Sequence, residues 1–227
     1  MTQLKPVSRY ALKRKIFKNL IQQYMSGTIE WKDPLLKPLK DLIRSLQRHE
    51  QKEICPYCQR IIIPERRNVT EHIEHFLDKS RDGYKKFAFT ASNLVLACQA
   101  CNIEKGTKNL LPSGRAIPTY LRASETPFLW PHPYFDDILT CVKKDHGPVY
   151  SAVVGSPRQA EAQNMIIDLK LNDIQNKESR YYKLIFKRDR LMNIIIKIAE
   201  RNMNGKRSGI RLESVKQELF RVNYELS

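Results

Sequence analysis

The cysteines constrain the fold of this chain more than any other feature. Four of the five lie in two CxxC pairs, Cys55/Cys58 and Cys98/Cys101. In a chain without a secretory signal, this spacing favours metal binding over disulfides. Four thiolates complete a tetrahedral zinc shell and leave no position open for catalysis. We therefore expect a structural Zn²⁺ site, with the fifth residue, Cys141, as a small buried hydrophobe.

The segment between the two pairs must form structure of its own. It holds 39 residues, whereas a zinc ribbon separates its pairs by about 15–20. Within it lies Glu71-His72-Ile73-Glu74-His75, a dense group of metal ligands and general bases. This cluster predicts a chemical site, and its alternative is a polar strand face that is merely solvated.

Further polar residues follow at Asn93, at Asn102 directly after the last cysteine, and at Lys105. Together with the acid-His cluster they resemble the motif of HNH, or ββα-metal, nucleases over Cys55 to about Lys108. The resemblance implies that Glu74 and Asn102 hold a catalytic Mg²⁺ or Mn²⁺, which suits oxygen ligands. It also implies His75 as the general base, Asn93 as the residue that fixes the His75 ring, and Lys105 as a phosphate contact.

The choice of acid-His pair stays open at this point, because Glu71-His72 is a second such dipeptide. Strand alternation puts Glu71 and His75 on one face and His72 and Glu74 on the other. Glu74 and His75 can therefore converge only where the strand ends or kinks. We favour Glu74-His75 because the surrounding sequence fits a particular subfamily.

That subfamily is the HNH subunit of Septu-type and retron-associated anti-phage defence systems. The similarity rests on Cys55-Pro56-Tyr57-Cys58, on Ile73–Lys79, on Asn93–Lys105 and on His132–Asp137. Asp78 departs from the pattern, which usually has Pro there. The resemblance implies an SMC/ABC-like ATPase as partner, and a retron reverse transcriptase with its nucleic acid as a further one.

The charge of the chain indicates a polyanionic partner. The net charge is +16, from 40 Lys and Arg against 24 Asp and Glu. Six basic and no acidic residues lie between Met1 and Ile29, and ten basic residues face two acidic ones between Arg180 and Arg211. Binding phosphates releases counterions and favours such a chain on nucleic acid. Solvated helix faces are the alternative. No stretch reaches the roughly 20 apolar residues of a membrane span, so we expect a cytoplasmic protein without a membrane partner.

The expected fold is α+β and mainly α-helical, with a zinc-supported ββα core between helical extensions. We divide the chain into an N-terminal helical segment (1–53), a nuclease core (54–111) and Pro-punctuated loops followed by a helical region (112–227). Apolar spacing predicts helices ending at Ser26-Gly27, over Pro34 to about His49, over Arg158–Asp168, from about Asp173 to Asn202 and from about Leu212 to Tyr224. Strands are expected over Arg60–Ile63, Val69–Phe76 and Asn93–Cys98.

The leading functional hypothesis is an endonuclease that hydrolyses DNA or RNA, transfer RNA included. Two alternatives remain open: a zinc-stabilised nucleic-acid-binding module without catalysis, and a subunit whose main task is to hold an ATPase. A complete set of Glu74, His75, Asn93 and Asn102 favours the enzyme, because a binding module needs none of them. His132, between two prolines, is read as part of a rigid packed turn, and His49 and His146 as surface residues.

Overall fold

The computed structural model describes residues 4–7, 12, 14–62, 71–123, 128–145, 149–203 and 209–226. The chain forms two compact units, one of Met1–Lys143 with Ala152–Leu169 and one of Lys144–Ser151 with Lys170–Ser227. The segments 1–53 and 54–111 thus share the first unit, and residues 112–227 are divided between the two. The α-rich α+β class is confirmed, with two small two-stranded sheets.

Two helices precede the cysteine-rich segment in the first unit. Helix α2 spans Lys15–Ser26 and ends where Gly27 adopts a φ of 83°, the left-handed conformation typical of a C-cap. The 3-10 turn η1 (Pro34–Leu36) leads directly into α3 (Lys37–Gln51), and Asp33 caps η1 by accepting from the Leu35 amide. The buried residues of η1 and α3 recur every three or four positions, which gives one face toward the core: Leu36, Leu39, Ile43, Gln47 and Gln51.

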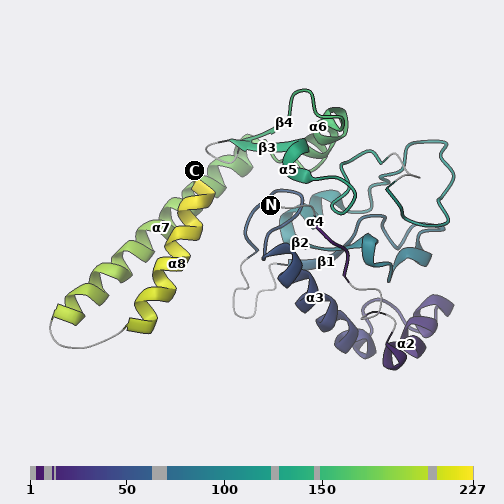
Figure 1. The fold of residues 1–227 in the computed structure, drawn as a ribbon, viewed down its shortest axis with the longest axis horizontal. Coiled ribbons are helices and arrows are strands. Elements are labelled where there is room, and N and C mark those ends of the chain that lie inside the picture. The colour runs from purple at the N-terminus through teal and green to yellow at the C-terminus, as the bar shows by residue number, and fades with distance from the viewer. Residues whose placement is uncertain are drawn as a thin grey trace. The chain divides into compact units, whose positions relative to one another are not determined.

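A two-stranded antiparallel sheet and a short helix form the centre of this unit (Figure 1). Strand β1 (Glu71–His75) pairs with β2 (Leu94–Cys98), with Glu71 opposite Cys98 and His75 opposite Leu94. Helix α4 (Gln99–Lys105) follows β2 without a loop and contacts both strands, and α3 also contacts both. The order strand, strand, helix agrees with the sequence-based expectation for this segment. Residues 63–70, where the first expected strand ends and the second begins, lie outside the described residues, and Ile61 forms only an isolated bridge with Ile54.

Side chains of α3 satisfy the edge of β2 that faces away from β1. The Gln51 amide accepts from the Leu96 N–H and donates to the Leu96 carbonyl, both at 2.8 Å, and Gln47 donates to the Leu94 carbonyl at 2.7 Å. Backbone polar groups that are buried must find such partners, because an unmade hydrogen bond is costly. These two glutamines therefore bind the helix to the sheet.

The rest of the first unit is built from short elements around an aromatic core. They are η2 (Lys85–Phe87), η3 (Ala91–Asn93), α5 (Ile138–Cys141) and α6 (Gln159–Asp168). The strands β3 (Val142–Asp145) and β4 (Val149–Ala152) form the second two-stranded sheet, and each is divided between the two units. Helix α6 begins one residue later than expected, because Arg158 is its N-cap. His132 is fully buried and stacks on Phe135 at 3.9 Å, as a packed turn predicts.

The second unit is dominated by two helices that pack on each other, α7 (Ile174–Met203) and α8 (Gly209–Leu226) (Figure 1). The expected ends of α7 are confirmed within one residue, whereas the predicted break at Asn204-Gly205 lies outside the described residues. Ile198 and Val222 are buried, and Lys187 and Glu218 form an ion pair at 2.6 Å between the helices. None of the described helices combines the length and the apolar character that crossing a bilayer requires.

Candidate functional site

The four paired cysteines converge on one point. Their sulfur atoms all lie within 4.8 Å of one another, and Cys58 Sγ is 3.7 Å from Cys98 Sγ. Zinc–sulfur bonds of about 2.3 Å in a tetrahedron place the sulfurs about 3.8 Å apart. Cys55, Cys58 and Cys101 are buried, and burial raises the pKa of the Cys55 thiol. A divalent cation compensates the charge of buried thiolates, so this donor set can hold a structural metal ion such as zinc.

The cysteines come from three places that the fold brings together. Cys55 and Cys58 lie on the turn after α3, Cys98 ends β2, and Cys101 lies in the first turn of α4. A metal ion here would tie the turn after α3 to the strand and the helix. Cys141, the fifth cysteine, is buried in α5 and does not belong to the cluster, as expected.

Glu74 is buried in β1 and both of its carboxylate oxygens have partners. Oε1 is 2.6 Å from Lys105 Nζ, and Oε2 accepts a hydrogen bond from the Tyr57 hydroxyl. Tyr57 lies between the first two cysteines, and its own pKa is raised by burial and then by the charge of Glu74. Lys105 is buried as well and also donates to the His75 carbonyl at 2.9 Å. The residue expected to contact a phosphate thus has its ammonium group inside the protein, as counterion to Glu74.

His75 is the last residue of β1, at the strand end where Glu74 and His75 can diverge from strict alternation. Its Nε2 lies 3.1 Å from the Ala88 carbonyl, and its ring packs edge-on against Trp31 at 4.6 Å. A carbonyl can only accept, so Nε2 carries the proton and Nδ1 keeps its lone pair. Burial, followed by the positive charge of Lys79, holds the pKa of His75 well below its usual range. The imidazole is therefore neutral, and only 4% of the His75 residue is exposed.

Asn93 is fully buried at the end of η3, directly before β2, and bonds the backbone near His75 rather than the His75 ring. The Asn93 amide accepts from the Leu77 N–H at 2.7 Å and donates to the carbonyls of Leu77 and Phe87 at 3.0 and 3.2 Å. The hydrogen bond expected between Asn93 and the His75 ring is replaced by the contact to the Ala88 carbonyl. Asn93 thus closes the loop that follows β1.

Asn102 is half-buried in the middle of α4, and its backbone carbonyl accepts from the Gly106 N–H at 3.1 Å. Within the part of the chain that the structure describes, the four cysteines form the one group of three or more Cys, His, Asp or Glu able to share a metal ion. Glu74 is engaged by Lys105 and Tyr57. The observed conformation therefore does not fit a hard divalent cation at Glu74 and Asn102 unless Lys105 withdraws.

The side chains of the alternative pair, Glu71 and His72, lie on opposite faces of β1. Glu71 is buried and forms a two-pronged ion pair with Arg48 of α3, at 2.9 and 2.5 Å. His72 is half-exposed on the other face, opposite Ala97. Asp78 accepts from the Ser80 N–H at 3.1 Å and from the Ser80 hydroxyl at 2.5 Å. Glu71 and Asp78 thus both have partners within the protein.

Sequence reasoning missed the partners of these residues. Trp31 packs against the His75 ring, and Arg48 pairs with Glu71. The Tyr57 hydroxyl bonds to Glu74. Only Tyr57 carried a signal, through its place between two cysteines. Trp31 and Arg48 lie more than twenty positions from the residues they contact, and nothing in the chain marks them as neighbours.

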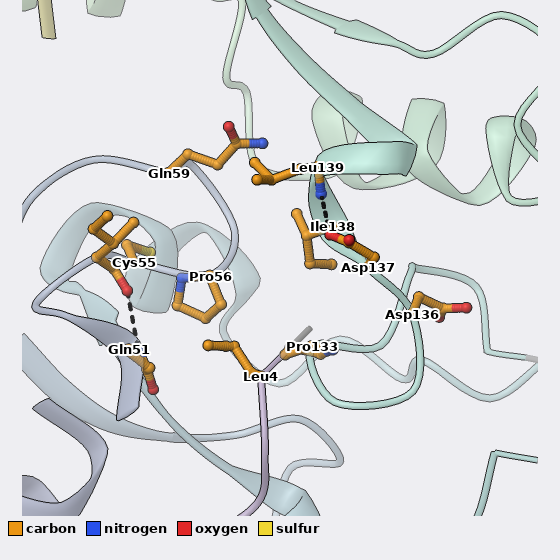
Figure 2. A pocket seen from close by; sticks show the side chains of 11 residues that line it. Leu4, Gln51, Cys55, Pro56, Gln59, Pro133, Asp136, Asp137, Ile138 and Leu139 are labelled. Carbon is orange, nitrogen blue, oxygen red and sulfur yellow. Dashed lines mark hydrogen bonds between the residues drawn. The ribbon is translucent and has the colours of Figure 1, made fainter. Parts of the chain in front are cut away.

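A small pocket lies on another side of the cysteine turn (Figure 2). Pro56, Pro133 and the short helix at Ile138 and Leu139 line it, together with Leu4 near the N-terminus. It includes Cys55 but neither Glu74 nor His75. The pocket is therefore separate from the acid-His site.

No protein-family model, curated protein or solved structure matches this chain.

Proposed function

We propose that this chain is an HNH-class endonuclease that hydrolyses phosphodiester bonds in nucleic acid. The observation that carries the proposal is the neutral imidazole of His75, whose Nδ1 is unprotonated. His75 ends β1, which pairs with β2. Helix α4 follows β2, and the four clustered cysteines lie beside these elements. The unprotonated Nδ1 can take a proton from water, and an opening of the site that exposes His75 would bring its depressed pKa back toward the value suited to general-base catalysis. The net charge of +16 supports a polyanionic substrate.

Each residue near His75 has a role in this proposal. His75 Nδ1 accepts a proton from the attacking water, while the Ala88 carbonyl holds the ring through Nε2. Asn93 fixes the loop after His75, and Lys105 holds both the Glu74 carboxylate and the His75 carbonyl. His72 is the alternative general base. Because it is half-exposed, it would take this role if His75 remained buried during the reaction.

We expect the active form to need Mg²⁺ or Mn²⁺, which would supply charge stabilisation for the leaving oxygen. Glu74 and Asn102 are the oxygen donors for such an ion, and Lys105 would have to leave Glu74 first. The closed arrangement thus points to a step that opens the site. The partner implied by the resemblance, an SMC/ABC-like ATPase with or without a retron reverse transcriptase, is a means of supplying it.

One observation favours a second function, a zinc-stabilised nucleic-acid-binding module without catalysis. Glu74 is neutralised by Lys105 and Tyr57, and His75 is almost fully buried. This is the arrangement expected if both residues only hold the fold together. A cleavage assay distinguishes the two functions.

The test is cleavage of single-stranded DNA, duplex DNA and RNA, including transfer RNA, by the purified chain with Mg²⁺ or Mn²⁺. We expect His75→Ala to abolish cleavage and His49→Ala, an exposed control on α3, to leave it unchanged. Loss of cleavage in His72→Ala with activity retained in His75→Ala would move the base to His72. Absence of cleavage in every condition, also with a co-purified ATPase partner, would favour the binding module. Circular dichroism of each variant shows whether the fold is intact.

A further inference from the structure

Three aromatic rings form a cluster directly outside His75. Trp31, on the turn between α2 and η1, lies 6.0 Å from Tyr24 of α2 and 5.5 Å from Phe89, measured between ring centroids. Tyr24 and Phe89 are 5.2 Å apart. Tyr24 is buried, whereas Trp31 and Phe89 are half-buried. Aromatic surface therefore reaches solvent next to the proposed base.

Three lysines from different parts of the chain surround these rings. Lys40 Nζ and Lys79 Nζ lie 5.9 and 5.2 Å from the centre of the Trp31 ring, and Lys85 Nζ lies 5.3 Å from that of Tyr24. All three are half-buried. We call the three rings and three lysines the Trp31 cluster. Cations over aromatic faces are favourable contacts, and they hold ammonium groups at defined positions.

No carboxylate among the described residues forms an ion pair with these three lysines. The nearby acidic residues are engaged elsewhere. Asp41 pairs with Lys37 and Arg44, and Asp78 accepts hydrogen bonds from Ser80. Lys40 Nζ donates to the Trp31 carbonyl at 3.1 Å, and the charges of Asp33 and Asp41 near Lys40, and of Asp78 and Glu74 near Lys79, offset part of the positive charge. None of these carboxylates forms an ion pair with the lysines, so the ammonium groups can still bind an anion from outside the protein.

We propose that the Trp31 cluster binds one strand of nucleic acid beside His75, with an unpaired base on Trp31 or Phe89 and phosphates on Lys40, Lys79 and Lys85. The proposal rests on the proposed function and gives its substrate class as single-stranded nucleic acid. Aromatic rings next to lysines are the combination that binds single strands, because bases that are not paired can stack on side chains. A duplex keeps its bases stacked internally and would use only the lysines.

The position of Trp31 connects binding to catalysis. The Trp31 and His75 rings meet edge to face, so a nucleobase stacked on Trp31 brings the neighbouring phosphates close to the imidazole that activates water. Binding that shifts Trp31 would also expose the His75 ring, which Trp31 now contacts. The α2–η1 turn, outside the strand-strand-helix segment, thereby becomes part of the site.

Binding can be measured without cleavage, in the absence of added divalent cations. The probe is a dye-labelled single-stranded oligonucleotide, compared with the same strand annealed to its complement. We expect tighter binding of the single strand and about tenfold weaker binding of it by Trp31→Ala. Trp31→Phe should lose less, because a ring remains. Equal binding of single strand and duplex, or unchanged binding by a folded Trp31→Ala, would overturn the proposal.

Tryptophan fluorescence gives a second readout. The chain has two tryptophans, and Trp130 is fully buried with its indole N–H bonded to Asp168. A change in fluorescence on adding unlabelled single strand should therefore come from Trp31 and vanish in Trp31→Phe. A signal that persists in this variant would assign the binding to another surface.

The lysines are tested by salt dependence. The triple variant Lys40→Gln, Lys79→Gln, Lys85→Gln should reduce the slope of log affinity against log salt by about 2, because each lost phosphate contact to a single strand contributes about 0.7. Lys32→Gln, which removes an exposed charge on the same turn, and Lys216→Gln, on α8, are the matched controls. Slopes that fall no more in the triple variant than in the controls would overturn the proposal.

These outcomes are separable from those of the proposed function. Oligonucleotide binding that depends on Trp31 can be found in a chain that does not cleave, in which case the nuclease proposal fails and the surface remains. Cleavage that is lost in His75→Ala but unchanged in Trp31→Ala and in the triple lysine variant would support the nuclease proposal and contradict single-strand binding at the Trp31 cluster.

Discussion

Glu74 and Lys105 are almost inaccessible to solvent, with exposed side-chain fractions of 3% and 1%. Burying two charges is costly, and the cost is offset only while they remain paired and hydrogen-bonded. Tyr57 and the His75 carbonyl supply those additional bonds. This small network therefore determines both the stability of the site and the ability of Glu74 to accept another cation.

Removing one partner should show this dependence. We expect Lys105→Met to lower the free energy of unfolding by about 3–5 kcal/mol, since it leaves a buried carboxylate without its counterion. The double variant Lys105→Met, Glu74→Gln should recover part of the loss. Urea unfolding provides the measurement. Lys37→Met, which breaks the exposed pair with Asp41, is the control and should change stability by less than about 1 kcal/mol. An equal effect in both single variants would contradict the argument.

His132 gives a pH dependence of stability. Burial, and then the charge of Arg158, lower its pKa from 6.5 to about 3. Below pH 6.5 the unfolded chain takes up a proton that the folded chain does not, so stability is fully present above this pH and is lost as the pH falls toward 3. The loss should be about 1.4 kcal/mol per pH unit within that window. His132→Phe, packed against Phe135, should remove this contribution. An unchanged pH dependence in this variant would show that His132 does not cause it.

At the scale of the elements, α3 and β2 depend on each other through side-chain amides. Gln51 is 1% exposed, and its side chain bonds both the N–H and the carbonyl of Leu96 as a neighbouring strand would. It also donates to the Ile54 carbonyl at 3.0 Å. The second edge of β2 is thereby closed by a helix rather than by a third strand. This explains how a sheet of only two strands is stable in the core.

Gln51→Met should therefore uncouple the helix from the strand. It keeps the length of the side chain but leaves the N–H and carbonyl of Leu96 without partners, at a cost of about 1–3 kcal/mol for each buried group. Hydrogen exchange of the Leu96 amide, together with urea unfolding, measures the effect. Gln22→Met, an exposed change on α2, should alter neither quantity. Unchanged protection of the Leu96 amide would mean that this bond is not formed in solution.

At the scale of the whole molecule, the cysteine cluster lies wholly within the first unit. It joins the turn after α3 to the end of β2 and the start of α4. The α7–α8 hairpin of the second unit contains none of these cysteines. Loss of the metal ion should thus affect the two units differently.

We expect about one zinc ion for each chain by elemental analysis and its loss in Cys101→Ser. Removal of zinc by a chelator should destabilise the first unit by several kcal/mol, because metal binding contributes directly to folding. The signal is loss of near-ultraviolet circular dichroism, while the α7–α8 helices retain their far-ultraviolet signal. Cys141→Ser, outside the cluster, should keep its zinc. Full zinc binding by Cys101→Ser would exclude the four-cysteine site.

The sequence by itself determined the local features of this protein. Apolar spacing located α3 and α7, and short β-like runs located both strands of the sheet, because helix and strand patterns are local properties. The two CxxC pairs identified the four cysteines that converge and can hold a metal ion, since four thiols at this spacing have few other uses. The sequence also singled out Glu74, His75, Asn93, Asn102 and Lys105 as residues that lie in or beside one small sheet.

Only the tertiary structure decided how those residues are connected. In the structure Lys105 pairs with Glu74 rather than with an external phosphate, and Asn93 bonds the backbone of Leu77. His75 contacts the Ala88 carbonyl and the Trp31 ring. Buried polar groups take whichever partner the packed chain brings within reach, and most of these partners come from distant positions in the sequence. A motif fixes which groups are present, whereas long-range packing fixes their charge state, their exposure and their partners.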